Sequence, residues 1–386
     1  MSLWKTRAAF LVLCGMTRFG LLLLLPVLAG AADPYQEKPS ASVQDTVKEP
    51  LRAEFSLEAA AGYLDNRAHL SENNCYACHS TFTYLPARSL IDPLAPEVMR
   101  TRVMLERFLT RLHDPKEAPK VKTNHIPRVR LLAAVELARH DAATTGKLSP
   151  ITQQAFDFIW TKLQTKDGGI DWLRVREAPQ AIDNWWPAAM IALGVEAMPE
   201  SDAQSELMKN GTEKLRGWFR AQSPQTLHER ALTLLAQAAL GGILDEKAGA
   251  EHVAALLAKQ HADGGWSMVD LAPWQRKDKK PLDPQLTDGY ATALCAYVLA
   301  RSSQRNEKAI AWLKSHQRET GGWFTQSPFA RDRIASNSGT SFAVQALAAS
   351  GEITPPKVTA EQFAAAKAKA EAEVPANVFL PEQDHP

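Results

Sequence analysis

The chain has 386 residues, of which 45% are hydrophobic, and its 44 basic and 43 acidic side chains leave a formal net charge of +1. A chain so close to neutrality offers no electrostatic footprint for nucleic acid. Four cysteines in this length exclude a disulfide-framed protein, and the length suffices for one large core or two smaller ones.

The first 32 residues have the pattern of a secretory signal peptide. Three basic residues lead into an apolar stretch at 21–28, which is followed by the small residues Ala29, Gly30 and Ala31. This order predicts cleavage near Ala31 or Ala32, a periplasmic or secreted protein, and no membrane span after cleavage. An uncleaved anchor is the alternative, although the apolar stretch is short for a bilayer. Met16 is an alternative start, because residues 16–31 carry a compact signal by themselves.

A polar, proline-containing leader at 33–51 precedes the motif Cys75-x-x-Cys78-His79. This pattern is typical of covalent haem attachment, in which two cysteines form thioethers to haem c and the adjacent histidine ligates iron. Attachment takes place outside the cytosol, which agrees with a signal peptide. A Cys75–Cys78 disulfide, a thioredoxin-like redox pair and a zinc site are the alternatives, but the last two lack a βαβ pattern and a second cysteine pair.

The rest of the chain predicts helices of two alternating kinds and no strands. One kind has a charged face, as expected of outer helices. These ranges are 52–70, 96–113, 150–164, 203–220, 246–260 and 306–317. The other kind is apolar nearly all round, as expected of buried helices. These ranges are 75–90, 127–138, 187–197, 229–241, 289–300 and 339–350. Six outer and six inner helices predict an all-α fold, an α6/α6 toroid over residues 52–354, with a helical or disordered tail at 355–386.

Three short repeats accompany this alternation. They are "QTKDGGIDW" from Gln164, "QHADGGW" from Gln260 and "QRETGGW" from Gln317. Each joins a helix-ending Gln to a Gly-Gly turn and an aromatic residue. Glycine can adopt the conformation that ends a helix, and the Trp can then pack back on the helix pair.

These stretches, together with "CYACHSTFTYLPARSL" and "TDGYATALCAYVLA", resemble a known family. The repeats are similar to the QW-type repeats of the terpenoid cyclase and protein prenyltransferase toroid superfamily. The combination with Cys-x-x-Cys-His resembles exported bacterial prenyltransferase/squalene-oxidase-repeat proteins. The resemblance covers roughly residues 52–350 and implies the toroid fold and a haem motif, but no settled reaction.

In such a toroid the inner helices would begin at one mouth of a central cavity, beside the haem. The residues near those starts are therefore candidates for lining the cavity. They are Arg128, Asp183, Trp185, Trp186, Glu229, Arg230, Asp288, Tyr290, Asn337 and Thr340. His125 and His228 are the candidates for a second axial ligand. Each of these residues also has an ordinary structural explanation, as a helix cap or a core side chain.

Some expected chemistry is missing. A class II terpene cyclase needs an Asp-x-Asp-Asp acid, and the nearest stretch here, "AIDNWW", offers Asp183 and Asn184. Cys295 lies in an apolar stretch with no aspartate two residues before it, which argues against a prenyltransferase zinc site and for a buried thiol. No metal site other than the haem iron is expected.

The sequence therefore favours a periplasmic cytochrome c-like redox protein that binds a hydrophobic, terpenoid-like or lipid-like molecule near its haem. Whether it is a haem-dependent oxidoreductase stays open. An electron-transfer or haem-sensing module with an electron-transfer partner is one alternative, and a cyclase-like enzyme without functional haem is another.

Overall fold

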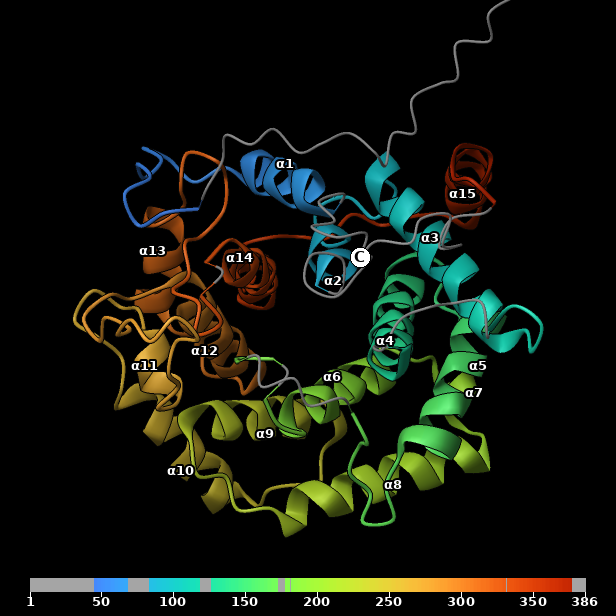
Figure 1. Cartoon of the computed structure of the whole chain (residues 1–386), viewed down its shortest axis with the longest axis horizontal. Coiled ribbons are helices and arrows are strands. Elements are labelled where there is room, and N and C mark those ends of the chain that lie inside the picture. Colours follow the sequence, from blue (N-terminus) through green and yellow to red (C-terminus); the bar gives the residue numbers. More distant parts are fainter. Residues whose placement is uncertain are drawn as a thin grey trace, which may run out of the picture. The chain divides into compact units, whose positions relative to one another are not determined.

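The computed structural model describes residues 45–68, 83–118, 126–172, 178–180, 182–330 and 332–376 (Figure 1). The chain divides into two units, residues 1–38 and 39–386, and every helix below belongs to the second. The described residues form helices and no β-strand, with three isolated bridges, so the all-α prediction is confirmed.

The helices of charged-face character begin and end close to the predicted ranges. They are α1 (Leu57–Ala68), α3 (Pro96–His113), α5 (Pro150–Phe158), α8 (Glu206–Ala221), α10 (Glu246–Leu257) and α13 (Glu307–Ser315). Four of them start at a side chain that caps the first turn, namely Ser149, Ser205, Asp245 and Asn306. Helix α5 continues as a π-helical turn, Ile159–Leu163, and the short helices α7 (Glu200–Ala203) and α11 (Met268–Leu271) lie in connections.

The second kind of helix is buried. These helices are α2 (Tyr84–Arg88), α4 (Ile126–Thr144), α6 (Trp185–Glu196), α9 (Leu227–Leu240), α12 (Gly289–Arg301) and α14 (Asp332–Ala349). In α12 every residue from Gly289 to Leu299 is buried, whereas in α10 only Leu256 is. These two helices differ in burial as expected, but the charged-face helix α3 does not fit, because ten of its eighteen residues are buried.

The buried helices contact one another in a cyclic order (Figure 1). Helix α2 contacts α4, and the succession continues through α6, α9, α12 and α14, which returns to α2. Each charged-face helix contacts a buried helix that is its neighbour in the chain. For example, α3 contacts α4, and α10 contacts α9. The core therefore lies among the buried helices, and the charged-face helices cover it.

The three Gln-Gly-Gly repeats join one charged-face helix to the next. Each glutamine amide donates to the carbonyl of the first glycine, four residues later, and to an acceptor near the following charged-face helix. The second acceptors are Gly211 O at 2.8 Å for Gln164, Asn306 Oδ1 at 3.0 Å for Gln260 and Ser56 O at 2.9 Å for Gln317. One sequence motif therefore makes the same joint three times.

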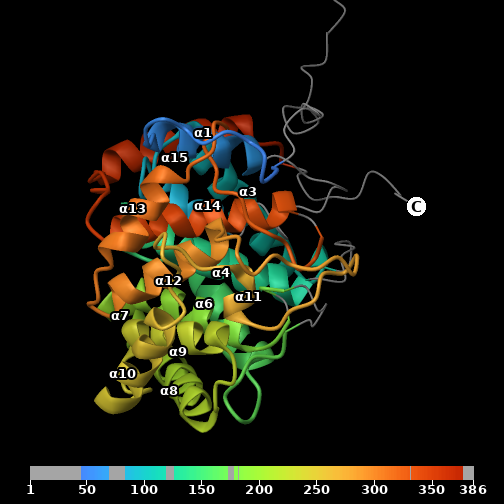
Figure 2. The ribbon, with the colours of Figure 1, turned by 90° about the vertical axis from the view of Figure 1, so that its left-hand side faces the viewer.

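The third joint connects the end of α13 to the first helix, α1 (Figure 2). Gly321, at φ +95°, lies so close to α1 that a Cβ there would be 2.0 Å from Ala59 O. The Arg52 amide donates to Gln317 O at 2.8 Å. Because residues 51–56 take part in this joint, α1 begins at Leu57 and not at residue 52 as predicted.

The tryptophans of the second and third repeats pack back on their helices as expected. Trp266 and Trp323 are fully buried, and their indole N–H groups donate to Leu256 O and Leu313 O, both at 2.8 Å. Each backbone N–H is accepted by a threonine of a buried helix, Thr292 in α12 or Thr340 in α14. The tryptophan thus ties a charged-face helix to a buried one.

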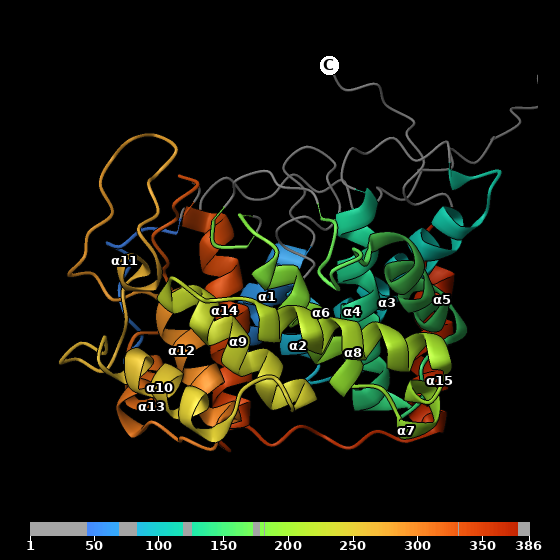
Figure 3. The same ribbon diagram turned by 90° about the horizontal axis from the view of Figure 1, so that it is seen from below.

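Residues near the end of the chain form α15 (Ala360–Glu373), which lies beside α3 in Figures 1 and 3. Phe363 is buried there under the Arg102 guanidinium, 5.0 Å from the ring centroid. Arg107 of α3 donates to Glu371 O at 2.8 Å and to Val374 O. Among the described residues, no helix combines the length and the apolar character needed to cross a membrane.

Candidate functional site

A histidine and a tyrosine meet inside the protein at the starts of two buried helices. His228 is the second residue of α9, and Tyr290 is the second residue of α12. The His228 Nε2 atom lies 3.1 Å from the Tyr290 hydroxyl, and neither residue has any exposed surface. The Tyr290 backbone N–H donates to Thr325 Oγ1 at 2.9 Å, which fixes the start of α12.

Burial keeps this pair uncharged. Removal from water lowers the pKa of His228 from its ordinary value to about 3. Burial, with the Asp183 carboxylate as the next cause, raises the pKa of Tyr290 well above its ordinary value. At neutral pH the pair is therefore a neutral imidazole hydrogen-bonded to a neutral phenol.

The start of α6 brings two further candidates to Tyr290. The Trp186 indole approaches the Tyr290 hydroxyl and lowers the pKa of Tyr290, whereas the Asp183 charge raises it. Asp183 Oδ1 also accepts the Trp185 N–H at 2.9 Å, which caps the helix. The structure therefore collects four of the predicted residues around one hydroxyl.

Trp185 faces a different neighbourhood. Its ring packs against Trp218 and Phe219 of α8, with centroids 5.3 and 5.9 Å apart. Successive helical residues point about 100° apart, so only one of two adjacent tryptophans can face the Tyr290 hydroxyl. Trp185 thus packs α6 on α8, and Trp186 faces the interior.

Two buried nitrogen atoms at this cluster, His228 Nδ1 and Trp186 Nε1, have no hydrogen bond of normal geometry. The Trp186 indole approaches the Tyr290 hydroxyl, whereas His228 Nδ1 has no partner among the described residues. An unsatisfied buried polar group costs about 1–3 kcal/mol, so a water or another molecule bonded to His228 Nδ1 would stabilise the protein.

Several other candidates have structural roles. Glu229 completes a capping box, with Oε2 accepting the Thr226 N–H at 3.0 Å. Asp288 caps α12 and accepts the Met268 N–H at 2.8 Å, and complete burial raises its pKa to about 8. Thr340 accepts the Trp323 N–H, while burial and then the Arg230 charge lower the pKa of His252 on α10. Asn337 is buried in α14. Because α14 begins at Asp332, Asn337 and Thr340 lie inside the helix and not at its start as predicted.

The remaining candidates cannot be placed. Cys75, Cys78, His79 and His125 lie outside the described residues, as does the Arg128 side chain. Cys295 is buried and free, as expected. Within the described ranges, no three His, Cys, Asp or Glu side chains gather to hold a metal ion.

Sequence reasoning missed residues that the fold brings to the cluster. The half-buried Trp274 meets the His228 ring edge-on at 5.0 Å, and Phe342 of α14 meets Tyr290 edge-on at 5.6 Å. Glu136 of α4, almost fully buried, accepts the Leu85 N–H at 2.9 Å. Glu136 was detectable as a single charge in the apolar stretch 131–138, but no local signal pointed to Trp274.

A scan against models of known protein families finds no match to this chain, and a search of curated proteins finds no similar sequence. The family resemblance of the repeats therefore stands on the quoted residues alone.

Proposed function

We propose that this chain is an exported c-type haem protein, built on an α6/α6 toroid, that binds an apolar small molecule in its interior. The observation that carries the proposal is the motif Cys75-x-x-Cys78-His79 in a chain that begins with a signal-like segment. Cys75 and Cys78 would form the thioethers, and His79 would be the proximal ligand. The cyclic order of the buried helices and the three equivalent joints support the toroid.

The described residues next to the motif fit a firmly held prosthetic group. Helix α2 is fixed from three sides: Glu136 accepts the Leu85 N–H, Ser341 donates to Thr83 O, and Asp65 accepts from the Tyr84 hydroxyl. His79 is four residues from Thr83, a span of at most about 14 Å. A haem on this motif would therefore lie near the start of α2, which Ser341 contacts from the middle of α14.

Haem supplies one-electron chemistry when it is bound, and its axial ligands decide whether small molecules gain access to iron. His228 is a weaker candidate for the second ligand than His125, because Nε2 of His228 is already bonded to the Tyr290 hydroxyl. The proposal therefore leaves the second position to His125 or to an added molecule. Carbon monoxide binding to the reduced protein separates these two, since only an accessible iron shifts its Soret band.

The test is a pyridine haemochrome spectrum with intact mass, on protein exported from a host that attaches haem. One covalent haem per chain is expected, and none in the variant with Cys75→Ser and Cys78→Ser. Cys295→Ser is the matched control and should keep its haem, since this thiol is buried in α12. A wild-type mass without haem, or one two hydrogens lighter for a disulfide, would refute the haem assignment.

A further inference from the structure

The unpartnered nitrogen of His228 has a defined chemical character. An indole can only donate a hydrogen bond, so the approach of Trp186 to the Tyr290 oxygen favours a hydroxyl whose own proton points to His228 Nε2. In a neutral imidazole the proton must then lie on Nδ1. His228 Nδ1 is therefore a buried N–H donor without an acceptor.

Only some ligands could satisfy this donor. The group opposite it must accept a hydrogen bond, which excludes ammonium and guanidinium groups. The Asp183 carboxylate is the charge that acts most strongly on Tyr290, and it disfavours an anion. A neutral oxygen of the carbonyl, ether or hydroxyl kind meets both conditions.

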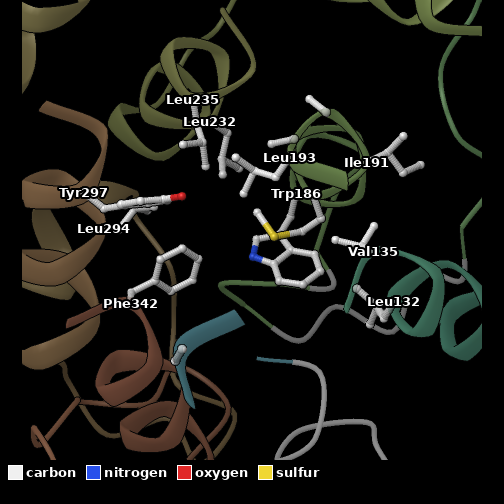
Figure 4. Close-up of a cluster of buried hydrophobic side chains, with 14 of the residues drawn as sticks. Leu132, Val135, Trp186, Ile191, Leu193, Leu232, Leu235, Leu294, Tyr297 and Phe342 are labelled. Carbon is white, nitrogen blue, oxygen red and sulfur yellow. The ribbon is translucent and has the colours of Figure 1, made fainter. Parts of the chain in front are cut away.

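The surroundings are apolar. Figure 4 shows Trp186, Tyr297 and Phe342 directed toward the same interior region, with Leu232 and Leu235 of α9 facing them. All five side chains are at least nine-tenths buried. Phe342 also contacts the Tyr290 ring, so the apolar region and the polar pair are continuous.

We propose that His228, positioned by Tyr290 and Trp186, is the polar end of a binding site for an apolar molecule that carries one neutral oxygen acceptor. The inference rests on the ligand-binding part of the proposed function and not on the haem. Tyr290 and Trp186 are positioning residues that set the tautomer, and His228 contacts the ligand oxygen.

The test compares two isosteres, 2-acetylnaphthalene and 2-isopropenylnaphthalene, which differ in a carbonyl oxygen and a methylene group. Equilibrium dialysis measures both affinities on the mature protein as it is exported from the same host, whether or not it carries haem. The ketone should bind about tenfold or more tightly than the alkene. His228→Phe should bring the ratio near one, whereas His252→Phe, the same change at a half-buried histidine of α10, should leave it unchanged.

A second measurement needs no variant. The ¹⁵N spectrum of the histidine rings should show His228 protonated at Nδ1, with a shift on addition of the ketone and none with the alkene. Equal affinities for the two probes, or an Nδ1 chemical shift that does not change when the ketone is added, would overturn the inference. Either result would mean that an ordinary internal water occupies the space at this nitrogen. Failure of both probes to bind would refute the ligand-binding part of the proposed function as well, while the haem assignment is decided separately by its spectrum.

Discussion

The joint between α13 and α1 can be tested with one methyl group. Gly321→Ala places a Cβ 2.0 Å from Ala59 O and 2.4 Å from Ala59 C, both backbone atoms of α1. The residue also has φ +95°, where a side chain costs about 1–2 kcal/mol. Displacement of packed backbone adds about 1–3 kcal/mol. The expected loss in the free energy of unfolding is therefore about 2–5 kcal/mol.

The control separates backbone strain from the contact. Gly351 has φ +79°, but its Cβ would meet nothing nearer than Arg305 Nη1 at 4.0 Å. Gly351→Ala should therefore cost only the conformational part, about 1–2 kcal/mol. Gly264→Ala should match Gly321→Ala, since its Cβ would lie 2.5 Å from Lys308 O of α13.

Guanidinium unfolding followed by far-UV circular dichroism measures all three variants. If Gly321→Ala loses no more stability than Gly351→Ala, then α1 does not pack on the turn after α13. The joint between the last and the first charged-face helices would then be refuted. If Gly321→Ala and Gly264→Ala agree, the second and the third joints of the repeats are energetically equivalent.

Substitutions at four other positions test the interior by chemical denaturation. Glu136→Ala should lose about 1–3 kcal/mol because it leaves the Leu85 N–H unsatisfied, whereas Glu136→Gln, which keeps an acceptor, should lose less; equal losses would contradict this role. Burial lowers the pKa of His140 to about 3, so its contribution to stability is full above about pH 6.5 and is lost as the pH falls toward 3; His140→Gln should reduce the slope of stability against pH there by about 1.4 kcal/mol per unit, and an unchanged slope would refute it. Burial raises the pKa of Asp288 to about 8, so its ionisation costs stability as the pH rises from about 4 to 8; Asp288→Asn should therefore gain on the wild type between pH 5 and pH 8, and a constant difference would count against it. Phe363→Ala should cost about 3–5 kcal/mol if α15 is docked in solution, and a loss below about 0.5 kcal/mol would mean that it is not.

Local sequence patterns predicted a helix well where its apolar residues and its capping residue lie within the same short stretch of sequence. The buried helix expected at 289–300 is observed as Gly289–Arg301, with Asp288 as its cap. The start of α1 was placed five residues early because residues 51–56 contact residues 317–319, a relation that no local pattern contains. The charged face of residues 52–56 was consistent with a helix, but their contacts with the distant residues 317–319 keep them out of α1.

The candidate site was predictable only in part, and for a geometric reason. The rule that helix starts gather at one place predicted Trp186, His228 and Tyr290, which do meet. The same rule also selected Thr340 and Asp288, which bond to backbone groups of their own and neighbouring segments. Which way a helical side chain points depends on rotations that composition does not specify, and Trp274 reaches the cluster from a long connection between helices.

The equivalence of the three joints has a consequence for the order of events during synthesis. Helix α1 is among the first parts of the unit to be made, but its partners at 317–322 come about 250 residues later. At typical elongation rates of about 5–20 residues per second, α1 waits on the order of 10–50 s for them. The two earlier joints link neighbouring segments and can form as the chain grows. Until the last repeat arrives, one side of the unit stays open, and the glycine-contacting surface of α1 at Ala59 and Tyr63 has nothing to bind. A nascent chain of this protein therefore exposes this surface of α1 to aggregation and proteolysis until the third repeat is made.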